Sequence, residues 1–193
     1  MKRSEINAAI ADARLAFERH HWHLPPKPRW DVTGFGLGDF RKYGLTLVNL
    51  AELPEYCEKL MFARGGQMTP LHTHKKKQED IICRVGTFAI RLVCAGEDFK
   101  PDRKASGSVR VLLNGEEKQV PNNTLLYLKQ GERITLFPGA YHEFWPVGEY
   151  CIIGEVSTAN DDVGDNYFEN PEIGRFEELV EDEPAIERLV SDK

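Results

Sequence analysis

A series of short apolar runs, separated by turn residues, constrains the fold of this chain more than any other feature. The runs lie between residues 45 and 158 and read LTLVNL, CEKLMFA, DIICRV, FAIRLVC, SVRVLL, TLLYL, RITLF, YHEFWPV and YCIIGEV. Strand-length runs at regular spacing, with no helical pattern between them, predict an all-β sandwich or barrel. Asn114 and Gly115, between two of these runs, predict a two-residue hairpin because both turn positions accept positive φ.

The segments on either side of this region differ in character. Residues 4–24 predict an N-terminal helix, with Ser4 as its N-cap and its end before the proline-rich stretch that starts at Pro25. The acidic tail, residues 159–193, has a weak helical pattern and is expected to form a short helix that caps the barrel or a partner subunit. With no internal repeat, residues 1–193 are expected to form a single domain whose barrel core spans about 45–158.

Composition excludes several classes of partner. The formal net charge of −6 disfavours nucleic acid and anionic membranes, and no apolar run approaches the length of about 20 residues that a membrane helix needs. The N-terminus lacks the features of a signal peptide. The 4 cysteines lie in apolar segments without CxxC spacing, which is typical of buried free thiols in a reducing compartment. We therefore expect a cytoplasmic protein that acts on a small molecule, with no nucleic acid and no membrane as partner.

The segment GGQMTPLHTHKKKQEDIICRVG carries the candidate chemistry. His72 and His74 are two residues apart, so on a strand both side chains point to one face. Glu79 starts the next apolar run, and a strand–turn–strand arrangement can bring it to the same point. His142 follows a Pro-Gly turn on a later strand. Three neutral imidazoles and one carboxylate suit Mn, Fe, Co, Ni or Zn, and the lack of a thiolate disfavours a closed structural zinc site.

The spacing of this segment resembles the first motif of the cupin superfamily. Every fixed position of that motif is matched, from Gly66 through His72, His74 and Glu79 to Gly86. The alternative, that these histidines are scattered surface residues, is disfavoured by a match at this spacing.

The second cupin motif matches less closely. Gly131, Pro138, Gly139 and His142 fit its skeleton, but Pro138 lies directly before the glycine, and Pro146 occupies the usual asparagine position. These departures concern the geometry of the loop and not the ligand. The two motifs together imply a cupin barrel, also described as a double-stranded β-helix or jelly roll.

Within the cupins, the chain resembles the D-lyxose isomerase family over most of its length. The similar segments are HHWHLPP, TPLHTHKKKQEDI, FPGAYHEFWP and GEVSTANDDVGDN. The resemblance implies interconversion of D-lyxose with D-xylulose, and often of D-mannose with D-fructose. It also implies Mn²⁺, or another divalent ion such as Co²⁺, Fe²⁺ or Zn²⁺, on His72, His74, Glu79 and His142. Cupins frequently dimerise, so a homodimer is expected.

Isomerisation of a sugar also needs a group that moves a proton and is not a metal ligand. Glu155 is the first candidate, because it lies inside the apolar run CIIGEVST, one strand after the strand of His142. Burying an unpaired carboxylate there is costly, which favours a functional reason for its presence. The alternative is that Glu155 pairs with an arginine. Lys59 is the second candidate and resembles a lysine position of the family, although strand lysines usually face solvent. Asp162 and Asp165 are candidates for binding sugar hydroxyls, although acidic loops are usually only solvated.

Three other functions stay open at this point. The same donor set serves iron or copper dioxygenases in other cupins, but those favour an apolar pocket. A sugar-phosphate isomerase would need a phosphate cradle, for which Arg84 and Arg91 are available. A non-catalytic sugar-binding or regulatory cupin is the third alternative, although no DNA-reading helix pair is evident.

Overall fold

The apolar runs form the strands of two antiparallel sheets in a computed structural model of the chain. The structure describes residues 1–158, 160–161, 164–174 and 178–192. Within these residues, the larger sheet has eight strands in the order β1 (Arg29–Thr33), β2 (Leu45–Glu52), β3 (Tyr56–Arg64), β13 (Tyr150–Thr158), β5 (Glu79–Val85), β11 (Arg133–Leu136), β8 (Ser108–Leu113) and β9 (Glu116–Pro121). The smaller sheet runs in the order β10 (Thr124–Lys129), β6 (Thr87–Ala95), β12 (Tyr141–Pro146), β4 (Thr69–Thr73) and β14 (Tyr167–Phe168), with β7 (Pro101–Asp102) paired to β6.

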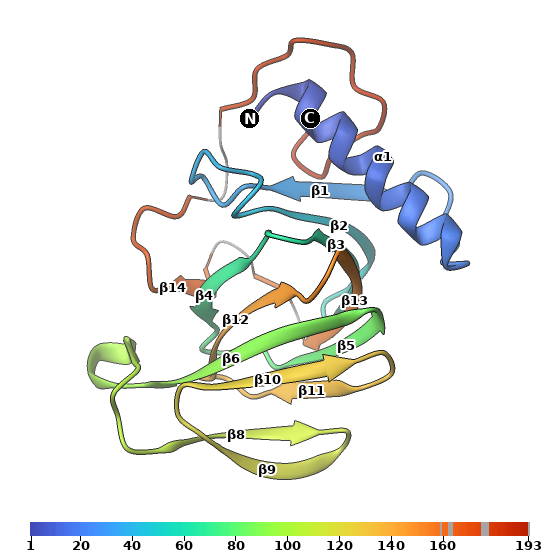
Figure 1. The fold of residues 1–193 in the computed structure, drawn as a ribbon. Helices are drawn as coiled ribbons and strands as arrows, with labels where there is room; N and C mark the ends of the chain where they lie inside the picture. The colour runs from blue at the N-terminus through green and yellow to red at the C-terminus, as the bar shows by residue number, and fades with distance from the viewer. Residues whose placement is uncertain (159, 162–163, 175–177, 193) are drawn as a thin grey trace.

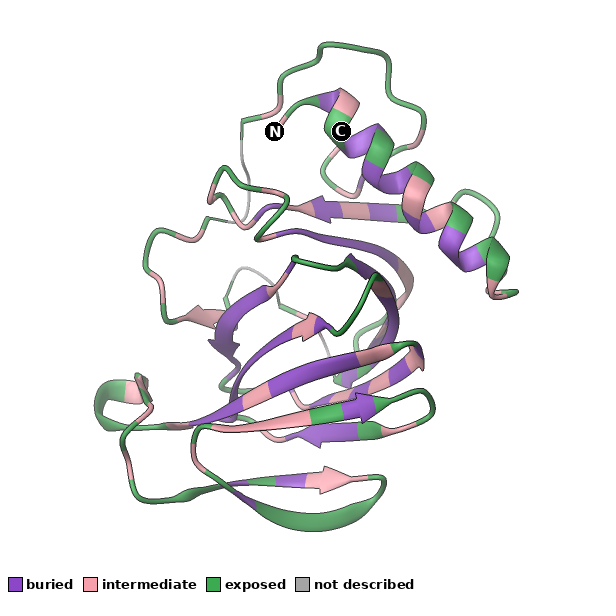
Figure 2. Ribbon diagram, in the orientation of Figure 1, coloured by how far each residue is buried: buried purple, intermediate pink, exposed green. Residues whose placement is uncertain are grey.

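The two sheets curl toward each other and enclose the main hydrophobic core (Figure 1). Alternation along each strand sends every second side chain inward, as in β5, where Glu79, Ile81 and Cys83 are buried and the residues between them are less so. The central strands are purple in Figure 2 because they are buried, whereas the β8–β9 hairpin at the edge of the larger sheet is largely exposed. The all-β barrel that the sequence predicts is confirmed, and strands β1 and β14 extend its sheets beyond the expected core of 45–158.

Helix α1 (Arg3–Arg19) lies across the outer face of the larger sheet, over β1, β2 and β3 (Figure 1). Its apolar residues recur every three or four positions, so one stripe is buried against the sheet. Phe17 stacks on Trp30 of β1 and meets Phe62 of β3 edge to face. This second core covers the outer face of strands that are already buried on their inner face.

The predicted ends of this helix need correction. The N-cap is Lys2, two residues before the predicted Ser4, and the helix ends at Arg19, five residues before the expected end at residue 24. The Lys2 amide donates to the Glu5 carboxylate. Ser4 is already inside the first turn, and its hydroxyl instead bonds Asp182 of the tail at 2.7 Å. At the other end, His21 takes a positive φ of 59° and the chain leaves the helix before the prolines.

The prediction of a helical C-terminal tail is wrong for the described residues, which form no helix after residue 158. The tail runs alongside α1 in an extended path, with single bridges from Val180 to Lys2 and from Leu189 to Trp30. The buried guanidinium of Arg3 donates to both Glu181 and Asp192. The carboxylates of the tail therefore find their partners on α1 and not within the tail. These contacts stabilise the short acidic segment more than a local helix would.

The hairpin that the sequence predicts at Asn114 and Gly115 is present. Asn114 and Gly115 have φ values of 52° and 84° and join β8 to β9. Strands β1 and β14 were not predicted: β1 follows the proline-rich stretch, outside the series of apolar runs, and β14 has only two residues. Strand β14 matters for the site, since it pairs with β4.

The cysteine prediction is confirmed for the described chain. All four thiols are free, and Cys57, Cys83 and Cys151 are buried. Among the described helices, none has the length and apolar character that a membrane crossing requires.

We predict that α1 and the barrel unfold as one cooperative unit, as expected for a single domain. Phe17 is fully buried, so Phe17→Ala should lower the free energy of unfolding by about 3–5 kcal/mol in a single urea transition. Leu15 lies on the same helix but is 56% exposed, and Leu15→Ala should change stability by less than about 0.5 kcal/mol. Two separate transitions in the parent protein would contradict the single-domain prediction.

Candidate metal centre and active site

Three histidines converge inside the barrel from the smaller sheet. His72 lies on β4 and His74 directly follows that strand, so both point to the interior as their spacing predicts. His142, on β12, is the direct cross-strand neighbour of His72, and their ring centroids are 4.2 Å apart. One ring nitrogen from each of the three lies within 4.8 Å of the others, and all three residues are buried.

The backbone fixes the orientation of each imidazole. The Nδ1 of His72 lies 2.8 Å from the Pro70 carbonyl, and the Nδ1 of His142 lies 3.1 Å from the Ala140 carbonyl. The Nδ1 of His74 lies 2.7 Å from the carbonyl of Asp165, far along the chain. A carbonyl only accepts, so each Nδ1 carries the proton and each Nε2 is left with a lone pair for a ligand.

Glu79, at the start of β5 in the larger sheet, faces these lone pairs. Its Oε1 is 3.1 Å from His74 Nε2, and its Oε2 is 3.3 Å from His142 Nε2. Neither His74 Nε2 nor Glu79 Oε2 makes a hydrogen bond, although both atoms are buried. Burial holds the pKa of His72 well below its ordinary value. Electron-rich atoms at this separation repel unless a cation lies between them, so the donor set fits a divalent metal ion.

A buried lysine partners the carboxylate on its other side. Lys77 Nζ is 2.7 Å from Glu79 Oε1 and 3.8 Å from Glu155 Oε1. Burial opposes the charge of Glu79, but the charge of Lys77 outweighs this effect, and the pKa of Glu79 lies well below its ordinary value. Burial likewise opposes the charge of Lys77, and the two carboxylates raise its pKa. The site is therefore a network of mutually compensated buried charges.

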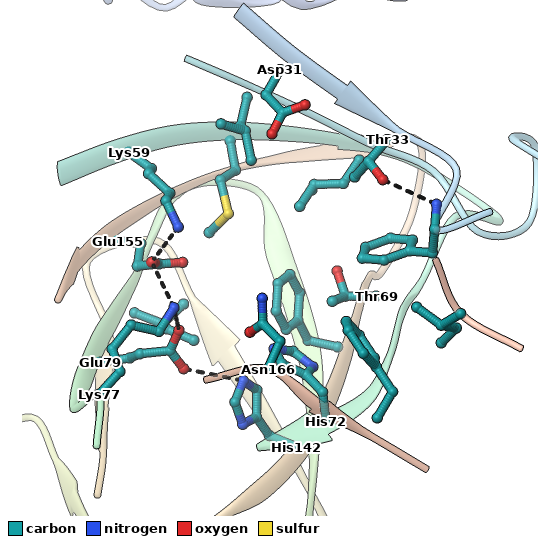
Figure 3. A pocket seen from close by; sticks show the side chains of 18 of the residues that line it. Asp31, Thr33, Lys59, Thr69, His72, Lys77, Glu79, His142, Glu155 and Asn166 are labelled. Atoms are coloured by element: carbon teal, nitrogen blue, oxygen red, sulfur yellow. Dashed lines mark hydrogen bonds and ion pairs between the residues drawn. The ribbon is translucent and has the colours of Figure 1, made fainter. Parts of the chain in front are cut away.

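His72, Glu79 and His142 line a cavity of about 390 Å³, within the size range of small-molecule sites. Figure 3 shows His72, His142 and Glu79 on one side of it and polar side chains on the facing walls. Apolar walls come from β2, β3 and β12, and include Leu47, Met61 and Phe144. No arginine lines the cavity among the described residues. Of the two arginines considered above for a phosphate, Arg84 stacks on Trp22 and Arg91 pairs with Glu143.

Glu155 and Lys59 both enter this cavity. They are direct cross-strand neighbours on β13 and β3, each only 7% exposed, and Lys59 Nζ is 3.2 Å from Glu155 Oε1. Lys59 also donates to Asn160. The partners of Glu155 are thus two lysines of the cavity and not the arginine considered as the alternative. Figure 3 shows the resulting chain of contacts from Lys59 through Glu155 and Lys77 to Glu79.

The two aspartates predicted to bind substrate lie differently. Asp162 falls outside the described residues. Asp165 is 2% exposed and does not line the cavity. Its carboxylate accepts hydrogen bonds from the backbone amides of Lys75, Lys76 and Lys77. These bonds, against the opposing effect of burial, lower the pKa of Asp165. Its side chain therefore organises the turn between the ligands.

Several cavity residues were not predicted from the sequence. They are Asp31, Thr33, Asn49, Thr69, Asn166 and Phe168. Phe168, on β14, stacks on the His72 ring at a centroid distance of 5.4 Å. Lys77 was not predicted either, although its position two residues before Glu79 favours a shared inward face. Asp31 and Thr33 lie on β1, and Asn166 and Phe168 lie beside or on β14, two strands that the sequence did not predict. Asn49 and Thr69 lie on predicted strands, but their polar side chains gave no signal that they face a cavity.

The curled double sheet and its inward cluster of three imidazoles and a carboxylate define a cupin barrel with a group that can hold a metal ion. Two solved L-ribose isomerases share this fold. The enzyme from Acinetobacter sp. DL28, a mutant in complex with L-ribose, superposes with a TM-score of 0.66 at 13% identity, covering 93% of this chain and 98% of that one. The enzyme from Cellulomonas parahominis with L-ribose gives a TM-score of 0.66 at 16% identity, with the same coverage of 93% and 98%.

Sequence comparison identifies the family. The pattern of the D-lyxose isomerase family matches residues 27–193. The D-lyxose/D-mannose isomerase of Escherichia coli O157:H7 is 36% identical over 96% of this chain and 95% of its own length. The protein of the same description from Thermosediminibacter oceani is 29% identical over 93% of this chain and 98% of its own. The chain belongs to the D-lyxose isomerase family.

We predict that replacing His72, His74 or His142 by Ala abolishes tight binding of a divalent ion, because each change removes one imidazole from the group. Elemental analysis of purified variants, and the loss of metal-induced thermal stabilisation, would measure this. His23 is exposed, and His23→Ala should keep the parent metal content. Undiminished metal in all three variants would contradict the assignment.

Proposed function

We propose that this chain is a metal-dependent aldose–ketose isomerase that interconverts D-lyxose with D-xylulose and D-mannose with D-fructose. The observation that carries the proposal is the position of Glu155. This buried carboxylate faces the imidazole cluster within one cavity and is held there by Lys59 and Lys77. Membership of the D-lyxose isomerase family supports the choice of sugars.

We assign the ligands as His72, His74, Glu79 and His142, and the metal as Mn²⁺, with Co²⁺, Fe²⁺ or Zn²⁺ as alternatives. The orphaned Glu79 Oε2 and His74 Nε2 support this assignment. A bound divalent ion would polarise the carbonyl and orient the oxygens on C1 and C2 of the sugar.

The residues of the chain perform the remaining work. Glu155 takes the proton from C2 of the aldose and returns it to C1, while the hydroxyl proton on O2 passes to O1, and the product is the ketose. The reverse reaction uses the same carboxylate. Both lysines contact Oε1, so Oε2 is the oxygen that we assign to proton transfer. Lys59 holds Glu155 in this orientation and contacts sugar hydroxyls as their charge changes. The apolar walls exclude water from the reacting carbons.

The contents of the cavity disfavour the alternatives. A dioxygenase favours an apolar pocket, whereas Lys59, Lys77 and Glu155 bring charge into this one. A sugar phosphate would leave its phosphate without an arginine, since none lines the described cavity. A non-catalytic sugar-binding cupin would bind the same sugars without converting them, so an activity assay separates it from an isomerase.

We predict that the protein loaded with Mn²⁺ converts D-lyxose and D-mannose to their ketoses. Nuclear magnetic resonance of the sugar in D₂O would follow the reaction and would also detect deuterium entering at C1 or C2. Protein treated with a chelator should lose the activity and regain it on addition of Mn²⁺. Sugar binding without interconversion, across the metals named above, would overturn the proposal.

We predict that Glu155→Gln lowers turnover by about two to four orders of magnitude, because the amide keeps the shape of the side chain but cannot accept the proton. Metal content and sugar binding should survive, and deuterium exchange should fall in parallel. Glu143→Gln is a matched control, since Glu143 is also buried but pairs with Arg91 and Arg103 outside the cavity. Near-normal turnover in Glu155→Gln would assign the proton transfer to another group, with Lys59 next.

The expectation of a cytoplasmic homodimer stays a prediction. Sedimentation velocity of the metal-loaded protein tests the dimer, and a single species at the mass of one chain would contradict it.

A further inference from the structure

The carboxylate of Asp165 occupies a cradle of three consecutive backbone amides. Its Oδ1 accepts from Lys75 N at 2.9 Å, and its Oδ2 accepts from Lys76 N at 3.0 Å and Lys77 N at 2.9 Å. A second contact joins Lys76 N to Oδ1 at 3.2 Å. Successive amides that point at one anion stabilise a turn that has no ladder of its own.

The main chain of Asp165 makes a different contact with the same loop. Its carbonyl oxygen lies 2.7 Å from His74 Nδ1, so Asp165 orients this imidazole while its side chain holds the next three residues. His72 and His142 take their Nδ1 partners from carbonyls two residues before them. The orientation of His74 therefore depends on a segment 91 positions away in the sequence, and that of the other two histidines does not.

The turn held in this way ends at a residue of the cavity. Lys77 leaves the cradle directly and reaches Glu79 at 2.7 Å and Glu155 at 3.8 Å. A small displacement of the turn would move the lysine between these two carboxylates and tilt His74 at its other end. The Asp165 carboxylate thus acts on a metal-facing imidazole and on the partner of the proton-transfer group.

The residues that follow Asp165 carry the same segment into the cavity wall. Asn166 and Phe168 line the cavity, and Phe168 stacks on His72, its partner in the β14–β4 pairing. Strand β14 is only two residues long, so its own ladder holds it weakly. The amide cradle gives this segment a second, charge-assisted attachment to the barrel.

We propose that Asp165 is a positioning residue, which clamps the 165–168 segment to the turn at 75–77 and thereby sets both His74 and Lys77. This inference rests on the metal ligands assigned under the proposed function. It replaces direct contact with sugar hydroxyls as the role of Asp165. The clamp predicts that loss of its charge disturbs metal binding and turnover together.

Asp165→Asn provides the test, because the amide puts an N–H group where a backbone N–H now donates and removes the negative charge. Titration with Co²⁺ alone should show metal affinity weaker by about 10–100-fold, as for other groups that orient a ligand. The visible absorption of the bound Co²⁺ should also change, because it reports the arrangement of the ligands. At saturating metal, kcat should fall by up to about 10²-fold through the displaced Lys77.

Asp102→Asn is the matched control. Asp102 also accepts from backbone amides, those of Lys104 and Ala105 at 2.9 and 3.1 Å, but it is exposed at the end of β7 and does not line the cavity. This variant should keep the parent affinity for Co²⁺, its absorption spectrum and kcat. Equal losses of Co²⁺ affinity and kcat in the two variants would mean that removing any such turn carboxylate has this effect, and would overturn the proposal.

Asp165→Glu keeps the charge and both oxygens on a longer side chain. It should recover part of the affinity that Asp165→Asn loses, and it decides the question if the Asn variant does not fold. Parent affinity and spectrum in whichever of the two variants fold would overturn the clamp. The Co²⁺ titration needs no sugar, so its result does not depend on the isomerase activity. A parent protein that converts no sugar would refute the proposed function but would not contradict the positioning role of Asp165.

Discussion

The structure depends on keeping charged groups inside a barrel whose walls are mostly apolar. A buried carboxylate or ammonium is costly unless opposite charges and hydrogen bonds surround it. Here Glu79 lies between Lys77 and the imidazoles, and Glu155 lies between Lys77 and Lys59. Each of these groups is satisfied by a partner from a different strand or turn. Charge pairs as well as the core therefore join β3, β13 and the turn before β5 at the site.

The same constraint separates the two sides of the cavity. On the side of the smaller sheet, backbone carbonyls take the Nδ1 protons and leave lone pairs on the three Nε2 atoms. On the side of the larger sheet, lysines hold the carboxylates. An electron-rich cluster thus faces a carboxylate held in place by ammonium groups, with room for a small molecule between them. A metal that polarises a sugar and a base that moves its proton need this division of roles.

The outer elements contribute by covering surface that the barrel would otherwise expose. Helix α1 buries the outer side of β1, β2 and β3, and the tail then buries polar groups of α1, including Arg3 and Asn7. The two ends of the chain come together in this way, far from the metal centre (Figure 1). The strands that carry Lys59 and Glu155 are stiffened by packing on both faces.

The sequence by itself determined the features that rest on local periodicity and spacing. These are the strands between 45 and 158, the Asn114–Gly115 hairpin, the helix before the prolines, and the inward-facing cluster of His72, His74, Glu79 and His142. Only the tertiary structure decided the rest, because it depends on residues far apart in the chain. The partners of Glu155 come from β3 and from a turn, so no local pattern separates a lysine partner from an arginine. Asp165 looks like one acid in a solvated loop until the fold places three amides around it. The sequence of the tail has a weak helical pattern, but helix propensity contributes little free energy. Contacts with α1, at the other end of the chain, outweigh it.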